Sequence, residues 1–338
     1  MRKWLPSLAL LSLISLFLGV YVGSVNVSPG EITSGIAYGI KSALSSVFHG
    51  VNPGEKPKYF VIVWEIRLPR VLLAYLVGLS LASAGVASQA LFRNPLADPY
   101  IIGISAGAGL GAALASVYLP SHMGLAALVS AVLSVIVVYS ISKVDGKVPV
   151  DTLLLAGIAF GFLSSAATWY ILLTHQDRAT LTWMWLMGTF NGADWDDVLE
   201  MAVVSGIGIG FLAGKWRELN LVLLGEESIA LGLDLHLYRK LFIGVITLLT
   251  AFSVSTAGII GFIGLMGPHI MRFIMGPNHR ELTPASALFG GVLLVIADLL
   301  ARTLARPTEL PVGIITALMG APFFLYLLMK HKRGELYS

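Results

Sequence analysis

Ten runs of mostly apolar residues constrain the fold of this chain more than any other feature. Each run is about 17 to 25 residues long, and a helix of that length crosses the roughly 30 Å hydrocarbon layer of a bilayer. Of 338 residues, 56% are hydrophobic and only 12% are charged, which is about half the charge of an average soluble domain. The sequence therefore predicts an all-α polytopic membrane protein with about ten transmembrane helices.

Charged residues, proline or glycine bound the expected spans. These spans are residues 5–25, 71–91, 101–119, 124–142, 152–173, 197–213, 237–256, 258–275, 285–302 and 312–329. The division at Gly258 is the weakest of these boundaries. The first run follows Met-Arg-Lys, as in a signal peptide, but it is long for one and lacks an Ala-x-Ala site, so we expect an uncleaved helix.

Basic residues predict the orientation, because cytoplasmic segments of membrane proteins are enriched in Lys and Arg. Most of the 22 Lys and Arg residues fall on one side if both termini are cytoplasmic. This predicts a multi-pass protein of the cell membrane, one domain of residues 1–338 with an outer loop at 26–63 and a cytoplasmic loop at 214–236. Ala84-Gly85 and Pro95 recur at the same spacing as Ala257-Gly258 and Pro268, which favours two inverted five-helix halves.

Several short motifs resemble catalytic or metal-binding signatures without the partners that such sites need. Gly103-Ile-Ser-Ala-Gly107 has the G-x-S-x-G pattern, but Gly103, Gly107 and Gly111 form a small-residue stripe suited to helix packing. His269 has no second histidine at metal-ligand spacing, which favours a packing role. The chain has no cysteine, and neither Gly-Lys pair is followed by Ser or Thr as in a Walker motif. We expect a protein that is not an enzyme, with no catalytic residue, metal or cofactor, and with ATP hydrolysis, if used, on another chain.

Charges gather where the second span should begin. Glu65, Arg67 and Arg70 surround Pro69 in the stretch VIVWEIRLPRVLLAYLVGL, residues 61–79. We expect the span to begin near residue 71, with Pro69 at the helix entrance and Glu65 restraining an arginine. Asp298 precedes Arg302 by four residues, which predicts an ion pair on one helix face.

Two cytoplasmic segments carry further signals. Gly225 and Gly232 interrupt residues 214–240, which predicts two short helices with two glutamates in the first turn of the second; a plain surface connector is the alternative. In residues 89–111, two prolines break the helix, and Asn94 and Asp98 are placed to cap the next turn of chain.

Six ordered stretches carry a family resemblance. They are RLPRVLLAYLVGLSLASAGVASQALFRNPLADPYIIGISAGA, GEESIALGLDL, AGIIGFIGLMGPHIMR, HRELTPASALFGG, ADLLAR and ELPVGIITALMGAPFFLYLL. From about residue 60 to 330 the chain resembles the permeases of ABC importers for iron-siderophores, haem and cobalamin, the FecCD/BtuC-like type II importers. The resemblance implies a homodimer in membrane lipid, two ATP-binding subunits on the cytoplasmic side and an extracytoplasmic substrate-binding protein. No nucleic acid is implied.

The resemblance also implies roles for particular residues. Those expected to face the binding protein are Arg67, Arg70 and Arg302. Those expected to receive the ATPase are Leu221, Gly225, Glu226, Glu227, Ala230 and Gly232. Those expected at a cytoplasmic gate are Asn94, Leu96, Val150 and Asp151.

Two rival functions remain open from the sequence. Inverted halves also fit an ion-coupled secondary transporter, but no convincing protonatable residue lies at a midplane position. A membrane-embedded enzyme would need a paired catalytic constellation. The cargo stays open among siderophore, haem, cobalamin and oxyanion.

Overall fold

Ten apolar helices form the body of the molecule. The structure, a computed structural model, describes residues 4–23, 25–47, 54–144 and 146–332. The ten are α1 (Trp4–Tyr21), α3 (Leu68–Leu91), α4 (Ile104–Tyr118), α5 (Met123–Ile141), α6 (Val150–Thr174), α8 (Trp195–Gly214), α11 (Leu235–Ala257), α12 (Ile263–Met275), α13 (His279–Thr303) and α14 (Val312–Lys332).

Within the described residues, seven helical segments are long and apolar enough to cross a membrane, and α4, α12 and α14 are shorter apolar helices. Together these correspond to the ten expected runs, so the predicted all-α fold is confirmed. The two ends of the chain, which we expect to be cytoplasmic, lie outside the described residues. The inverted five-helix halves stay a prediction.

The helix containing Arg67 and Arg70 begins earlier than the hydrophobic pattern predicts. A π-helical segment, η1 (Val61–Arg67), runs directly into α3, so the expected start near residue 71 is wrong. Pro69 is the second residue of α3, as expected for a proline near a helix entrance, although η1 continues the helix before it. The N–H of Leu68 donates to the carbonyl of Val63, five residues back, and this wider turn accommodates a proline that has no N–H of its own.

Other helical segments connect these ten helices. They are α2 (Pro29–Val47), α7 (Gln176–Leu186), α9 (Trp216–Val222), α10 (Glu227–Ala230) and the 3-10 turns η2 (Pro99–Ile102) and η3 (Pro120–His122). The hydrophobic pattern does not predict α2, which lies inside the expected outer loop at 26–63. Ser28 and Glu31 exchange hydrogen bonds at its start, as in a capping box.

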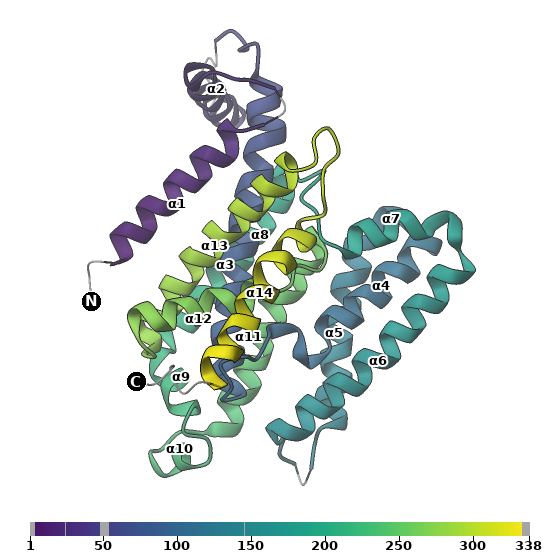
Figure 1. The fold of residues 1–338 in the computed structure, drawn as a ribbon, viewed down its shortest axis with the longest axis vertical. Helices are drawn as coiled ribbons and strands as arrows, with labels where there is room; N and C mark the ends of the chain where they lie inside the picture. Colours follow the sequence, from purple (N-terminus) through teal and green to yellow (C-terminus); the bar gives the residue numbers. More distant parts are fainter. Residues whose placement is uncertain (1–3, 24, 48–53, 145, 333–338) are drawn as a thin grey trace.

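Figure 1 shows α3, α11 and α13 at the centre of the bundle, with α2 at one end and α10 at the other. Helices α4 to α7 form a group to one side, and α11 packs against α4 and α5. The glycine stripe of α4 faces α5: a Cβ at Gly107 would lie 2.5 Å from the side chain of Ser134, and one at Gly111 would clash with the carbonyl of Ala126. The predicted packing role of this stripe is confirmed.

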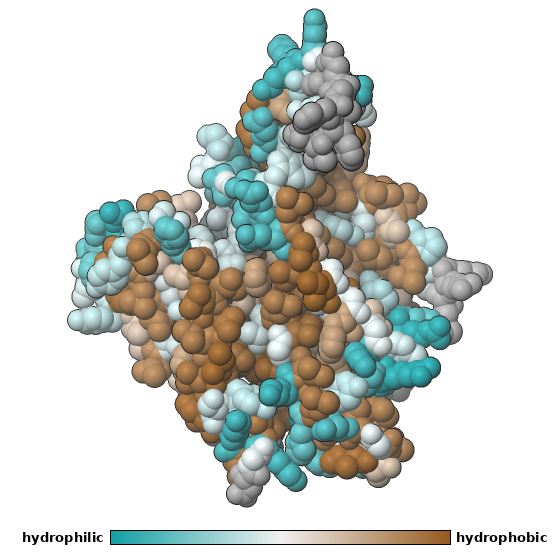
Figure 2. Space-filling view, turned by 180° about the vertical axis from the view of Figure 1, so that it is seen from behind, coloured by the Kyte–Doolittle hydropathy of each residue, from teal (hydrophilic) through white to brown (hydrophobic). Residues whose placement is uncertain are grey.

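The outer surface of the bundle is apolar around its middle. Figure 2 shows hydrophobic side chains across the centre of one face and hydrophilic ones toward its two ends. His269 lies with its ring centroid 4.9 Å from that of Phe273 and 6.0 Å from that of Phe323, which agrees with the expected packing role.

Candidate functional site

Three arginines fasten the end of α1 to the rest of the bundle. Arg67, Arg302 and Arg306 donate hydrogen bonds to backbone carbonyls where α1 ends, at the end of the bundle that we call the arginine end. The acceptors are the carbonyl oxygens of Gly19, Val20, Tyr21, Val22, Gly23 and Val25. The last carbonyls of a helix have no partner within the helix, so these guanidinium groups act as its C-terminal cap.

A second arginine interaction lies beside this cap. Nη2 of Arg70 lies 2.9 Å from Oδ1 of Asp298, and Nη1 lies 2.8 Å from Glu309. Nε of Arg302 lies 3.0 Å from Oδ2 of Asp298, which confirms the pair predicted from their spacing. Two carboxylates therefore balance two guanidinium groups, as burial of charge requires.

The predicted docking arginines are thus mostly buried, and each already contacts partners within the chain: Arg67 donates to backbone carbonyls, and Arg70 and Arg302 pair with Asp298. Only 5% of Arg67 and 9% of Arg70 is exposed. Glu65 is exposed and joins none of the ion pairs among the described residues, so the expectation that it restrains an arginine is wrong. Glu309 and Arg306 were not singled out from the sequence; both are exposed, and Glu309 begins the ELPVG stretch that carries the family resemblance.

The opposite end of the bundle holds residues 214–236, which we call the coupling segment. As predicted, it forms two short helices, α9 and α10, with Glu226 at the N-cap and Glu227 at the first residue of α10. Gly225 and Gly232 adopt φ of +64° and +85°, a region that favours glycine. Of the expected ATPase-facing residues, Glu226, Glu227, Ala230 and Gly232 are exposed, Leu221 is half-buried and Gly225 is buried.

Polar contacts anchor α9 to two long helices. Lys215 lies 3.1 Å from Glu218, and the hydroxyl of Tyr238 in α11 donates to the same carboxylate at 3.2 Å. Although burial acts in the opposite direction, hydrogen bonds from its own backbone, Lys215 and Tyr238 hold the pKa of Glu218 below its ordinary value. Oδ1 of Asn220 lies 2.7 Å from Nδ1 of His279, the first residue of α13.

The first gate turn, residues 92–98, follows α3. Oδ1 of Asn94 accepts from the N–H of Leu96 at 2.9 Å, and Oδ1 of Asp98 accepts from Tyr100 at 2.8 Å as the N-cap of η2. Both predicted capping contacts are confirmed. Burial raises the pKa of Asp98 to about 6. Leu96 is 43% exposed, so it projects from the turn.

The second gate turn, residues 146–151, leads into α6. An isolated β-bridge between Val144 and Lys147 lies at its beginning, and α6 begins at Val150 with Asp151 exposed in its first turn. Val150 lines a cavity of about 30 Å³. The other lining residues are Leu91, Tyr139, Gly146, Lys147, Val148, Leu153, His236, Arg239 and Ile243.

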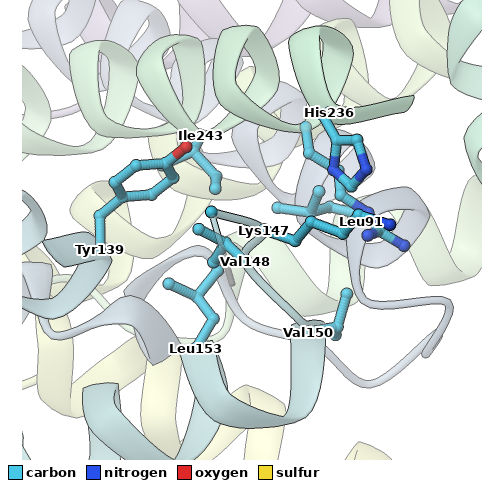
Figure 3. Close-up of a pocket in the computed structure, with 10 residues that line it drawn as sticks. Leu91, Tyr139, Lys147, Val148, Val150, Leu153, His236 and Ile243 are labelled. Atoms are coloured by element: carbon cyan, nitrogen blue, oxygen red, sulfur yellow. The ribbon is translucent and has the colours of Figure 1, made fainter. Parts of the chain in front are cut away.

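Figure 3 shows this cavity between the second gate turn, which carries Lys147, Val148 and Val150, and the side chains of His236 and Ile243 from the start of α11. Leu91, which directly precedes the first gate turn, also lines it. The structure therefore brings the second gate turn, the last residue of α3 and the end of the coupling segment together, whereas Asn94 and Leu96 do not line this cavity. The three docking arginines lie apart from them, at the arginine end.

A larger cavity of about 330 Å³ lies between α4, α6 and α7. Trp169 and Trp183 line it with their rings in an edge-to-face arrangement, 5.0 Å between centroids. Across the described part of the chain, no three His, Asp or Glu side chains gather in a group that could hold a metal ion.

Comparison with known proteins agrees with this architecture. Residues 10–330 match the model of the FecCD transport family. The cobalamin import system permease protein BtuC of Halobacterium salinarum is 46% identical over 273 residues, which are 79% of this chain and 73% of that protein. The vitamin B12 import system permease protein BtuC of Citrobacter koseri is 36% identical over 338 residues, covering 98% of this chain and 95% of that protein.

Among solved structures, a metal-chelate type ABC transporter in an inward-facing conformation superposes with a TM-score of 0.83 at 29% sequence identity. The match covers 98% of this chain and 100% of that one. The family match, the two relatives and the shared fold each cover most of this chain. This chain therefore belongs to the FecCD transport family, and it is the membrane-spanning permease subunit of an ABC importer rather than an enzyme.

Proposed function

We propose that this permease moves cobalamin from a binding protein into the cytoplasm, with a separate ATPase subunit supplying the energy. The observation that carries this proposal is the identity of 46% and 36% to two permeases whose names specify cobalamin or vitamin B12. An iron-siderophore or haem is the second candidate cargo, supported by the fold shared with a metal-chelate transporter.

The apolar walls of the cavity between α4, α6 and α7 suit a bulky substrate that must be released after it binds. Trp169, Trp183 and Leu172 offer it broad contact, and Ser105, Ser165 and Thr168 supply only neutral polar groups. A surface of this kind binds weakly and without a strong charge preference. We place the route of the substrate along α6, beside this cavity.

The proposed orientation puts the arginine end outside and the coupling segment in the cytoplasm. The distribution of Lys and Arg supports it, because most basic residues then lie on the cytoplasmic side, as do both termini. Residues 1–338 form one permease domain in this proposal, with an outer loop at 26–63 and an ATPase-coupling loop at 214–236.

The proposed assembly is a homodimer with two ATP-binding subunits below and a binding protein above. Helix α6 supports the homodimer, because its apolar window is the least buried of the seven long spans, at 17%. Its exposed apolar side chains need cover from lipid or from a second copy. The exposed glutamates of α10 support docking of the ATPase on the coupling segment.

The docking arginines require a modified proposal. Since the side chains of Arg67, Arg70 and Arg302 are mostly buried, we propose that the binding protein contacts the exposed members of the same charge cluster, Arg306 and Glu309, although these two also contact Gly23 and Arg70. The three buried arginines then support this surface by fixing α1 and α13.

Reconstitution tests the proposed function. We expect proteoliposomes containing the permease, its ATPase and the binding protein to accumulate radiolabelled cyanocobalamin when ATP is present. Uptake of a ferric siderophore or haemin in place of cobalamin would establish the second candidate. Uptake by the permease alone, driven by an ion gradient without ATPase, would instead support an ion-coupled secondary transporter.

A further inference from the structure

We propose that Arg93 and Arg239 are positioning residues that connect the coupling segment to the two gate turns. In this inference, Arg93 carries movement of α10 to the first gate turn, and Arg239 carries it to the second. The inference rests on the proposed function, because it assumes that an ATPase moves the coupling segment.

Arg93, in the first gate turn, lies against Gly225 of the coupling segment, and both residues have a positive φ. The φ of Arg93 is +49°, a conformation uncommon for a residue other than glycine. Its guanidinium lies over Gly225: a Cβ at that glycine would lie 2.6 Å from Nη1 and 3.2 Å from Cζ. Gly225 itself has a φ of +64°. A side chain at position 225 would therefore displace the arginine that directly precedes Asn94.

Arg239 joins the coupling segment to the second gate turn. Its Nη2 lies 3.3 Å from Oε1 of Glu226, which precedes α10. The same arginine lines the cavity that also contacts Val150, and only 11% of its side chain is exposed. Within the described residues, its buried Nε has no hydrogen-bond partner. Arg239 thus contacts Glu226, which precedes α10, and also lines the cavity beside the second gate turn.

Both links have the properties of a contact that can rearrange. The side chain of Glu226 is 68% exposed, so water and salt screen its pair with Arg239. The cavity that Arg239 and Val150 both line has about the volume of one water molecule, so the packing between these two side chains is incomplete. A left-handed arginine is a strained conformation, which persists only while its surroundings hold it. Movement of α10 would therefore change both gate turns together.

The test is the number of substrate molecules moved per ATP hydrolysed by the reconstituted complex. For Arg93→Ala and Arg239→Ala, we expect ATP hydrolysis to continue while this ratio falls by about fivefold or more, the usual lower range of coupling between sites. Glu226→Gln should lower the ratio in the same direction; because Glu226 is exposed, this variant tests the link without disturbing the fold. Lys240→Ala is the matched control, since Lys240 is exposed and follows Arg239 directly.

Charge reversal tests whether the pair of Arg239 and Glu226 itself carries the coupling or whether substitution of Arg239 merely disturbs the structure. If Arg239→Glu lowers the ratio and adding Glu226→Arg restores it, the pair itself carries the coupling. An unchanged ratio in Glu226→Gln and Arg239→Ala, in complexes that assemble and hydrolyse ATP like the wild type, would overturn the inference. If the wild-type chain neither assembles with an ATPase nor takes up substrate with it, the proposed function fails instead.

Discussion

Arg70 and Asp298 form a buried two-point contact between α3 and α13, in which Nε and Nη2 of Arg70 lie 3.0 and 2.9 Å from the same oxygen, Oδ1. Arg302 reaches the other oxygen of Asp298 from one turn further along α13. A single carboxylate, 1% exposed, therefore contacts both guanidinium groups, and Glu309 supplies the second negative charge. Arg70, Asp298 and Arg302 interrupt the apolar pattern of the sequence. Their contacts hold α3 and α13 together, and Arg302 also contacts the end of α1.

Removal of Asp298 should destabilise the protein strongly. Asp298→Ala leaves Arg70 with only Glu309 and leaves Arg302 without a carboxylate partner, and breaking a buried pair in this way costs about 3–5 kcal/mol. The measurement is the free energy of unfolding, or the melting temperature, of the purified chain in detergent. Asp177→Ala is the control, because its pair with Arg178 is exposed on both sides and is worth about 0–1 kcal/mol. Equal losses in the two variants would contradict a stabilising role for the network.

Charge reversal at an exposed arginine tests the docking proposal. Arg306→Glu should weaken binding of the binding protein by about tenfold, mainly through slower association, because the new carboxylate would repel the acidic group that a complementary surface presents to Arg306. The measurement is surface plasmon resonance on the permease in nanodiscs. Lys240→Glu, at the opposite end of the bundle, should leave the affinity unchanged.

Reversal of Arg67 and Arg70 together is a less specific experiment, because both side chains hold other parts of the chain in place. If Arg306→Glu and Glu309→Lys both bind like the wild type, the binding protein docks elsewhere.

The hydrophobic pattern was sufficient to predict the ten apolar helices of the bundle, because each must satisfy its backbone hydrogen bonds within one apolar run. Local capping also followed from the sequence: Asn94, Asp98 and the Asp298–Arg302 pair all act within a few residues of chain. These contacts depend on spacing along one helix or turn and need no knowledge of the packing.

The partners of the arginines did not follow from the sequence, because they are set by packing between distant segments. Glu309 lies 239 residues from Arg70, and the carbonyls capped by Arg302 belong to α1. Helix α2 was missed for another reason: its alternating small, polar and apolar residues are too weakly hydrophobic to resemble a span. The resemblance to a family placed the docking role on Arg67 and Arg70, but only the fold shows that both are buried.

Cross-linking tests the proposed homodimer. The chain has no cysteine, so a single introduced cysteine reacts alone. Leu163→Cys on α6, where the leucine is 68% exposed, should give a dimer with a short bis-maleimide in native membranes. Leu133→Cys on α5, where the leucine is 53% exposed, is the control that should stay mostly monomeric if that face contacts lipid. Equal yields for both variants, or none for Leu163→Cys, would argue against an interface along α6.

The raised pKa of Asp98 predicts a pH-dependent stability. Burial raises the pKa of its carboxyl to about 6 in the folded chain, above an unfolded value of about 3.9. The folded state therefore holds the proton more tightly, and stability falls as the pH rises from about 4 to 6, where the buried carboxylate must ionise. Asp98→Asn keeps an oxygen that can cap η2 but carries no charge, so this loss should disappear.

Melting temperatures at pH 4 and pH 7.5 compare the protein with Asp98 protonated and with Asp98 ionised. At pH 7.5, Asp98→Asn should be more stable than the wild type by about 1–2 kcal/mol, less than the full shift implies because Asp98 keeps part of its surface exposed. At pH 4 the advantage should largely vanish. Asp151→Asn, at an exposed position of the second gate turn, is the control for the Asp-to-Asn substitution itself. An advantage of Asp98→Asn that is the same at both pH values would mean that the amide improves packing or capping, and that ionisation of Asp98 does not destabilise the first gate turn.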